Sequence, residues 1–446
     1  MNDHRGRAFP GLANKNQNTK AFIGIIARSR RTVRGSQVGS GSQRAMFTYR
    51  ATSEIAAHVT RIEALRAAVD RQGPLPRVWL GRTRRDLEAE ATAASVRLEG
   101  ISVTADEARR ILAGDPPATV EAEDVAHVLG YREAMALVLG RADDPAFIYQ
   151  RELVLGIHRA VMSGSYAEEA GRVRRIQNRL VDRSSGREVF VPPAPADVPG
   201  LLDEMCELLH TEDVSAPVAS ALAHVRLAAV HPFRDGNGRT ARIVASLAMF
   251  RGGYRSPYFT SLEEWWGRHP ERYYAAFECL GMRFDPHADV TPFVRAHVEA
   301  QAAQAEALSL RNATERALWT VLEDLSTHEL KVDERAAHAL YDALFGRTVT
   351  NRYYRALADV SDVTAVNDLR RLVAAGMLEP RGGGRTSHYV GTVRLLDTIA
   401  GGAGVDVGSL PDGSYCERAD AVIATLASRM QGGEVREDSV PYCAKR

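Results

Sequence analysis

The sequence predicts a mostly α-helical fold that carries one small β-hairpin and continues into a second unit of two short helices and another hairpin. Three observations lead to this class. Apolar residues recur at helical spacing through most of the 446 residues. Short β-like runs flank two turn signals, at residues 183–186 and 381–385. The composition, 45% hydrophobic and 25% charged, is ordinary for a soluble globular protein of two to four domains.

Residues 1–45 differ in composition from the rest of the chain. They hold nine Lys/Arg and one Asp and show almost no periodic apolar pattern, which predicts a disordered basic arm. Met46 follows directly, so the arm is either not native protein or a tether to nucleic acid or a membrane surface. The net charge of +1 therefore conceals −7 on residues 46–446, which excludes a strongly basic nucleic-acid binder.

The cysteines and the apolar runs predict a cytoplasmic protein. The four cysteines lie far apart without Cys-x-x-Cys spacing, so we expect reduced thiols and neither a zinc site nor a disulfide framework. The longest early apolar run, residues 21–27, is too short to span a bilayer, and no later run approaches the length required. We expect neither a signal peptide nor a membrane partner.

The densest cluster of chemically active side chains is His231-Pro-Phe-Arg-Asp-Gly-Asn-Gly-Arg-Thr-Ala-Arg242. Apolar residues then recur at helical spacing over 243–250, so the glycine-rich turn opens a helix. Backbone N–H groups at a helix N-terminus lack intrahelical partners and attract anions, typically phosphate. Gly236 and Gly238 allow an anion to approach the backbone closely, and the sequence therefore predicts a phosphate site here.

The charged side chains of the same stretch suit a nucleotide. Arg239 and Arg242, three residues apart, emerge on one side of the helix and can hold further phosphates. Asp235 precedes the turn and is placed to bind Mg²⁺ together with those phosphates. His231 titrates near neutrality, which makes it a natural general base.

These residues resemble the signature of the Fic family, His-x-Phe-x-(Asp/Glu)-Gly-Asn-Gly-Arg-x-x-Arg, at every fixed position. The resemblance implies transfer of a nucleoside monophosphate, usually AMP from ATP, to a Ser, Thr or Tyr hydroxyl of a protein. Related proteins that phosphorylate carry Lys in place of Arg239, so the intact arginine argues against that reaction. The implied roles are general base for His231, Mg²⁺ ligand for Asp235, loop anchor for Phe233, anion hole for Gly236, Asn237 and Gly238, and phosphate contacts for Arg239 and Arg242.

A second motif lies earlier in the chain. Ser95-Val-Arg-Leu-Glu99-Gly100 ends a helical pattern and places Ser95 and Glu99 on one face. By itself this is an ordinary solvated helix end. Beside the Fic signature it resembles the inhibitory motif (Ser/Thr)-x-x-x-Glu-(Gly/Asn), which implies that Glu99 pairs with Arg242 and withholds it from the γ-phosphate.

The remaining features of the predicted core concern binding of the target peptide and of the nucleotide base. Residues 175–181 and 187–191 predict a hairpin, which is either an ordinary surface hairpin or, by resemblance, the flap that receives the target peptide as an added strand. Aromatic residues follow over 263–277, and the resemblance places Tyr273 near the nucleotide base. His269-Pro270 stands where relatives often carry Asn, so base recognition is less defined than phosphate recognition.

The second unit follows a helix expected over residues 292–310. Helices over 350–358 and 363–375, then strands over 376–380 and 388–390, resemble a winged helix. Eight arginines against four acids over residues 347–395 suit either DNA or a protein partner. The side chains suited to groove contacts are Thr364, Asn367, Arg370 and Arg371.

We therefore predict a Fic helical fold with a hairpin flap and a C-terminal winged helix-turn-helix domain. The expected divisions are the arm (1–45), a helical region with the inhibitory helix (46–145), the Fic core (146–300), the winged helix (310–395) and a loose tail (396–446). The predicted activity is a protein adenylyltransferase that uses ATP and Mg²⁺, modifies a protein target or itself, and forms a homodimer. Two alternatives stay open: removal of AMP with the help of Glu99, and a DNA-binding regulator whose Fic domain senses nucleotide.

Overall fold

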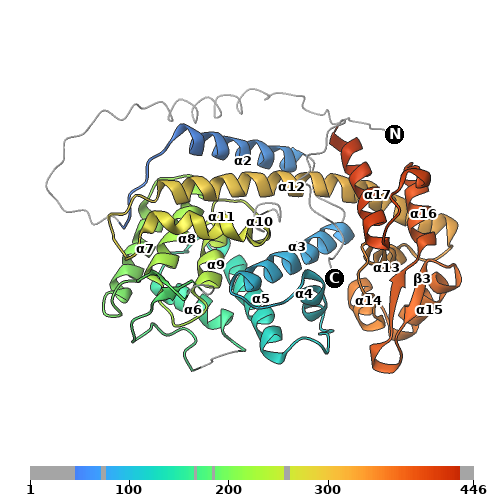
Figure 1. The fold of residues 1–446 in the computed structure, drawn as a ribbon, viewed down its shortest axis with the longest axis horizontal. Coiled ribbons are helices and arrows are strands. Elements are labelled where there is room, and N and C mark those ends of the chain that lie inside the picture. Colours follow the sequence, from blue (N-terminus) through green and yellow to red (C-terminus); the bar gives the residue numbers. More distant parts are fainter. Residues whose placement is uncertain (1–45, 72–76, 165–167, 183–185, 256–261, 432–446) are drawn as a thin grey trace, which may run out of the picture. The chain divides into compact units, whose positions relative to one another are not determined.

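The computed structural model describes residues 46–71, 77–164, 168–182, 186–255 and 262–431 (Figure 1). Helices dominate these ranges, and their named strands form two separate two-stranded antiparallel hairpins. No helix in these ranges is long and apolar enough to cross a membrane. The predicted basic arm, residues 1–45, lies outside the described residues.

Four helices precede the core. The third of them, α4, begins with a capping box in which Thr104 and Glu107 satisfy each other's backbone N–H groups. The helix that carries Ser95 ends at Leu98, Glu99 follows directly, and Gly100 then takes a positive φ of 87°, as expected of a glycine after a helix. The bounds are α2 (Ser53–Arg71), α3 (Arg77–Leu98), α4 (Ala105–Leu112) and α5 (Ala122–Ala142).

Two buried helices form the centre of the core. Helices α8 (Ala216–Val230) and α9 (Asn237–Arg251) pack against each other, and residues 231–236, the first half of the His231–Arg242 motif, form the loop that joins them. Ala, Val and Leu occur on all sides of α8, which is the pattern of a helix surrounded by protein. Helices α6 (Arg151–Val161) and α7 (Val198–Thr211) complete this cluster.

The predicted hairpin is present, but its regular pairing is short. Strands β1 (Leu180–Val181) and β2 (Glu188–Phe190) are antiparallel, with Leu180 opposite Phe190. The chain beyond β2 pairs elsewhere, because the backbone of Val191 bonds to Met282 and Phe284. The hairpin is therefore held at its base by a distant segment.

The aromatic-rich segment over residues 263–277 forms two short helices. Helix α10 (Leu262–Arg268) is separated by His269 from α11 (Pro270–Ala275), which is followed by a 3-10 turn (Ala276–Leu280). Pro270 offers no N–H and disfavours helical backbone in the residue before it, which explains the φ of −127° at His269.

Helix α12 (Thr291–Asp324) is longer than expected and crosses the predicted boundary between residues 300 and 310. Its first half lies beside α2, as Figure 1 shows, with Arg61 and Glu306 paired between them. Its last turns carry Leu318 and Leu322 into the core of the C-terminal region. A single helix thus belongs to both parts of the chain.

The C-terminal region, residues 325–431, contains the expected order of two helices and a hairpin. Ser361 and Thr350 cap the two helices, and Asp359 takes a left-handed φ of 53° in the turn between them. The interpretation of this order as a winged helix stays a prediction. The bounds are α13 (Ala337–Leu344), α14 (Asn351–Ala358), α15 (Asp362–Ala374), β3 (Leu378–Arg381), β4 (His388–Gly391), α16 (Val393–Gly402) and α17 (Tyr415–Gln431).

The expectation of a loose tail from residue 396 is wrong for the described residues. Helices α16 and α17 bury Ile399, Ile423 and Leu426 in the core of the C-terminal region. The glycines and polar residues between the two helices obscured this contribution in the sequence. They divide the apolar residues into two short amphipathic stripes, one on each helix.

The close packing of α5 on α6 yields a prediction about two glycines of one helix. A Cβ added at Gly130 would lie 2.5 Å from the carbonyl oxygen of Val161, whereas one added at Gly140 would meet nothing within 4 Å. Gly130→Ala should therefore destabilise the protein by about 1–3 kcal/mol, because α6 must move away. Gly140→Ala should be neutral or stabilise by up to about 1 kcal/mol through better helix propensity. Urea denaturation measures both, and equal shifts in the two variants would contradict the packing described.

Candidate active site

The loop between α8 and α9 owes its shape to two left-handed residues. His231 has a φ of 48° and ends α8, and Gly236 has a φ of 72° and caps α9. Phe233 between them is fully buried. Its ring stacks on the imidazole of His158 from α6, with ring centroids 3.6 Å apart and an interplanar angle of 1°. The aromatic anchor expected from the sequence therefore packs against a second ring.

The side chain of Asn237 holds the loop closed. Its Oδ1 accepts a hydrogen bond from the N–H of Phe233 at 2.8 Å, and its Nδ2 donates to the carbonyl of Phe233 at 2.9 Å. Asn178, just before the flap, donates to the same carbonyl. The side chain of Asn237 is thus occupied, and only its backbone N–H is left for an anion.

The N-terminus of α9 offers backbone donors to such an anion. The N–H of Thr240 bonds to the carbonyl of Gly236 and is the first to bond within the helix. The N–H groups of Asn237, Gly238 and Arg239 precede it and have no intrahelical acceptor. Together with the positive end of the helix dipole, they suit an anion, and binding of phosphate at this turn stays a prediction.

His231 is poised as a neutral base. Its Nδ1 lies 3.3 Å from the carbonyl oxygen of Ala228, which can only accept, so Nδ1 carries the proton and Nε2 is unprotonated. Burial lowers the pKa of His231 to about 4, against the opposing effects of the Ala228 carbonyl and Glu99. The imidazole is therefore neutral at pH 7, and its Nε2 is available as a proton acceptor.

Arg174 and His158 support the loop and were missed in the sequence. Arg174 donates from Nε to the carbonyl of His231 at 2.8 Å and from Nη2 to that of Pro193 at 2.6 Å, so it joins the loop to the base of the flap. His158 accepts from the N–H of Gly171 and lies 3.0 Å from the carbonyl of Asp235. Burial lowers the pKa of His158 to about 4, which keeps it neutral. Both residues lie 57 or more positions before the loop atoms they contact, and no local spacing signals them.

Arg239 is held by a histidine that the sequence also failed to reveal. Its guanidinium donates from Nη1 to Nδ1 of His127 at 2.7 Å and pairs from Nη2 with Asp235 at 3.3 Å. Because a guanidinium only donates, this nitrogen of His127 is unprotonated. Burial and then the charge of Arg239 lower the pKa of His127.

The carboxylate of Asp235 fits a metal bound jointly with phosphates. Its side chain is 52% exposed, at the mouth of the loop, while its partner Arg239 is buried. No group of three or more His, Cys, Asp or Glu side chains among the described residues could hold a metal by itself. One carboxylate plus substrate phosphates is a usual arrangement for Mg²⁺, so the residue present suits that ion.

The structure brings Ser95, Glu99 and Arg242 together. Arg242 is 2% exposed and donates from Nη2 to Glu99 Oε1 at 2.9 Å and from Nε to Ser95 Oγ at 2.9 Å. The carbonyl of Ser95 accepts a further bond at 2.8 Å. A Cβ added at Gly238 would lie 2.2 Å from Glu99 Oε1, so this carboxylate rests directly against the N-terminal turn of α9.

Tyr273 contacts the same arginine. Its hydroxyl accepts a hydrogen bond from Nη1 of Arg242 at 3.0 Å and lies 3.2 Å from Nε2 of the buried His224. Burial raises the pKa of Tyr273 to about 12, so the phenol stays protonated. The expectation that Tyr273 lies near the base stays a prediction, whereas its contact with Arg242 is a feature that the sequence did not suggest.

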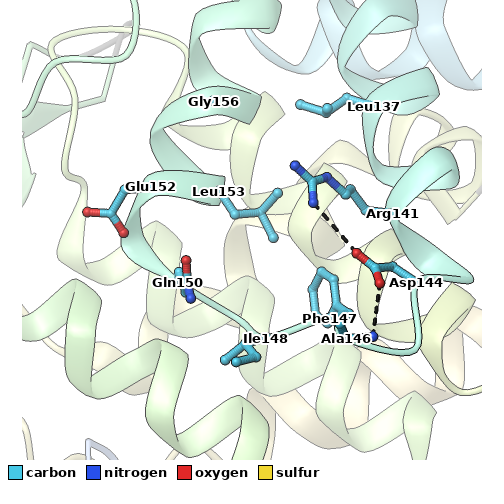
Figure 2. Close-up of a pocket in the computed structure, with 10 residues that line it drawn as sticks. All are labelled: Leu137, Arg141, Asp144, Ala146, Phe147, Ile148, Gln150, Glu152, Leu153 and Gly156. Carbon is cyan, nitrogen blue, oxygen red and sulfur yellow. Dashed lines mark hydrogen bonds and ion pairs between the residues drawn. The ribbon is translucent and has the colours of Figure 1, made fainter.

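A cavity of ≈310 Å³ lies away from these residues. It opens where α5 ends and α6 begins, and its lining includes Arg141, Asp144 and Phe147 (Figure 2). Arg141 and Asp144 form an ion pair at its edge. It contains none of the residues of the motif, so volume alone does not locate the candidate active site.

The chain is similar to known proteins over the region just described. Residues 149–249 match the model of the Fic/DOC family. The chain is 31% identical over 171 residues to protein adenylyltransferase Fic of Nematostella vectensis, covering 38% of this chain and 36% of that protein. It is 35% identical over 145 residues to protein adenylyltransferase fic-1 of Caenorhabditis briggsae, covering 32% of this chain and 25% of that protein. The matches thus span about a third or less of these relatives.

The fold is shared with a solved structure. A Fic family protein from Desulfovibrio desulfuricans aligns over 77% of this chain and 97% of its own, with a TM-score of 0.51 and 22% sequence identity. The matched segment 149–249 contains α6, the flap, α8 and most of α9, and hence the loop with His231 and the anion-binding turn. Residues 149–249 of this chain therefore match the Fic/DOC family, and the chain shares its fold with a solved Fic family protein.

Proposed function

We propose that the protein is a protein adenylyltransferase that transfers AMP from ATP to a hydroxyl of a protein, and that Glu99 holds it inactive. One observation carries this proposal: the unprotonated Nε2 of His231 and the free backbone N–H groups of α9 belong to the same short loop. A base and an anion site so close together suit attack of a hydroxyl on a phosphate. The names of the relatives, protein adenylyltransferases, support the same chemistry.

The proposed reaction assigns a task to each group. His231 Nε2 takes the proton of the acceptor hydroxyl, whose oxygen forms a bond to the α-phosphorus while the bond to the β-phosphate breaks and pyrophosphate leaves. The N–H groups of Asn237, Gly238 and Arg239 stabilise the charge on the α-phosphate. Arg239 and Arg242 bind the outer phosphates. Asp235 would hold Mg²⁺, which neutralises charge on the phosphates.

The hydroxyl belongs to a protein target or to the chain itself. The flap supports a peptide substrate, because β1 and β2 are short and Val181 and Val189 are exposed. An extended peptide can add to such a strand through main-chain hydrogen bonds. Arg174 links Pro193, at the end of this flap, to the carbonyl of His231 and so connects the proposed peptide site with the proposed general base.

Inhibition follows from the contact between Glu99 and Arg242. While the carboxylate binds Arg242 and rests on the turn at Gly238, the arginine is withheld from the γ-phosphate and negative charge lies where the phosphates bind. A carboxylate at that place could alternatively orient water for removal of AMP, and the Glu99 variants below separate the two directions.

We expect His231→Ala to lower transfer by about 10²–10⁴-fold in the Glu99→Gly background, because the base is lost. Binding of ATP should persist, since the backbone donors of α9 remain. Labelling by α-phosphate-labelled ATP and calorimetric titration of ATP measure the two effects. Arg234→Ala is the matched control in the same loop, because Arg234 is exposed and pairs only with Glu169 in the described structure. Undiminished labelling of the His231→Ala variant would remove the base from the mechanism.

The lowered pKa of His231 predicts an unusual pH profile. A base with the ordinary histidine pKa of about 6.5 would lose about tenfold in activity between pH 7.5 and 5.5. His231, with a pKa of about 4, stays neutral over this range and is protonated only as the pH falls through about 4. The value of kcat/KM for ATP in Glu99→Gly should therefore change by less than about twofold between pH 7.5 and 5.5. A tenfold fall, in protein that circular dichroism shows to be folded, would contradict the assignment.

Glu99→Gly should raise self-labelling by ATP well above wild type, because Arg242 becomes available to the γ-phosphate. Arg242→Ala should not be activated by the same change, so the two substitutions should be strongly non-additive. Glu99→Gln keeps the shape without the charge and should fall between wild type and Glu99→Gly. Equal labelling of wild type and Glu99→Gly would refute inhibition, and faster AMP removal by the wild type would identify the reverse reaction.

A further inference from the structure

The inhibitory helix α3 is held from two sides. Successive helical residues are about 100° apart, so Glu90 and Glu99, nine positions apart, lie on opposite sides of α3. Glu99 faces the active-site arginine Arg242. Asp86 and Glu90 are four residues apart on the other side and bind three arginines, of which one, Arg347, belongs to the C-terminal region.

The carboxylate of Asp86 joins two arginines. Its Oδ1 accepts from Nε of Arg109 on α4 at 2.9 Å, and its Oδ2 accepts from Nη1 of Arg347 at 3.1 Å. Arg347 also donates to Asp342 at 2.9 Å and stacks on the ring of Phe345. The side chains of Asp86, Arg109, Arg347 and Asp342 are all less than 10% exposed. Such buried charges tolerate the loss of a partner poorly.

A second arginine contacts the same face from α12. Arg311 binds Glu90 with both terminal nitrogens and donates from Nε to Glu315 at 2.7 Å. Seven residues later α12 enters the core of the C-terminal region at Leu318. The contact is therefore continuous with the region that supplies Arg347.

A third contact lies next to these two. The hydroxyl of Thr350, which caps α14, donates to Asp115 at 2.7 Å, and Arg110 binds the same carboxylate. Asp115 follows α4, the helix that provides Arg109. The C-terminal region thus contacts both α3 and the segment that packs against it.

We propose that the C-terminal region positions the inhibitory helix, so that the Asp86–Arg347 contact keeps Glu99 on Arg242. This inference rests on the proposed function, because it assumes that Glu99 inhibits. A movement of the C-terminal region that separates Arg347 from Asp86 leaves buried charges without partners and favours displacement of α3. The active site then responds to events at Arg347, which lies more than 100 residues after Arg242 in the sequence.

The experiment compares self-labelling by ATP and Mg²⁺ in four full-length proteins: wild type, Arg347→Met, Glu99→Gly and the double variant. Arg347→Met should raise labelling by about 3–10-fold, less than Glu99→Gly does, and should add nothing in the double variant. Asp86→Asn, which keeps the shape of the side chain, should act in the same direction and decides the question if Arg347→Met does not fold. Arg418→Met is the matched control, because Arg418 pairs with Asp397 inside the C-terminal region and should leave labelling unchanged.

Hydrogen exchange of residues 90–99 separates this inference from the proposed function. Faster exchange in Arg347→Met, with no change in Arg418→Met, supports the positioning role whether or not Glu99→Gly is active. Folded Arg347→Met and Asp86→Asn variants with wild-type labelling and wild-type exchange would overturn it. Failure of Glu99→Gly to raise labelling would instead refute the proposed inhibition and leave the exchange result to decide the role of the C-terminal region.

Discussion

The structure around the candidate active site depends on the hydrogen-bond partners of one buried guanidinium, that of Arg242. Arg242 is almost completely inaccessible, and its donors are taken by Glu99, by the hydroxyl and carbonyl of Ser95, and by the hydroxyl of Tyr273. A buried arginine without acceptors is costly, so α3 cannot withdraw unless other acceptors replace it. Phosphate oxygens suit this geometry. In the proposed function, inhibition by Glu99 and binding of the nucleotide phosphates are therefore two ways to satisfy the same buried charge.

The loop that presents His231 is shaped without help from a ligand. Left-handed turns at His231 and Gly236, the amide clamp of Asn237 and the stacked ring of His158 fix its path. Each of these contacts is made within the protein, so the imidazole of His231 and the backbone donors of α9 are held in place without a ligand, as the proposed reaction requires. Such preorganisation is what makes fixed dipoles effective in stabilising charge.

The local part of the site could be predicted from the sequence, and the distant part could not. The spacing of residues 231–242 places the glycine turn at the start of a helix, which is where it lies. The pairing of Glu99 with Arg242 came from the resemblance of two short motifs to known ones. His127, His158 and Arg174 approach from separate segments, and only the tertiary structure reveals that they meet Arg239 and the loop.

In the fold, too, local features could be predicted from the sequence and distant contacts could not. Helix α9 begins at the glycine turn, where the sequence predicts a helix start. The helix expected over residues 292–310 instead continues through Arg311 and Asn312 to Asp324. Both Arg311 and Asn312 are buried, and Arg311 is balanced by Glu315, four residues further along α12, and by Glu90 of α3, which sequence alone could not bring to this site.

The uninterrupted α12 has a consequence for how this architecture can vary. An α-helix advances about 1.5 Å and turns about 100° with each residue, so inserting a single residue between Leu308 and Leu318 would rotate everything beyond it by more than a quarter of a circle. Loops absorb such changes in length, but a rigid helix transmits them. The number of residues in this helix therefore fixes the rotation of the C-terminal region about the helix axis. Only steps of about seven residues, two full turns, leave that rotation nearly unchanged.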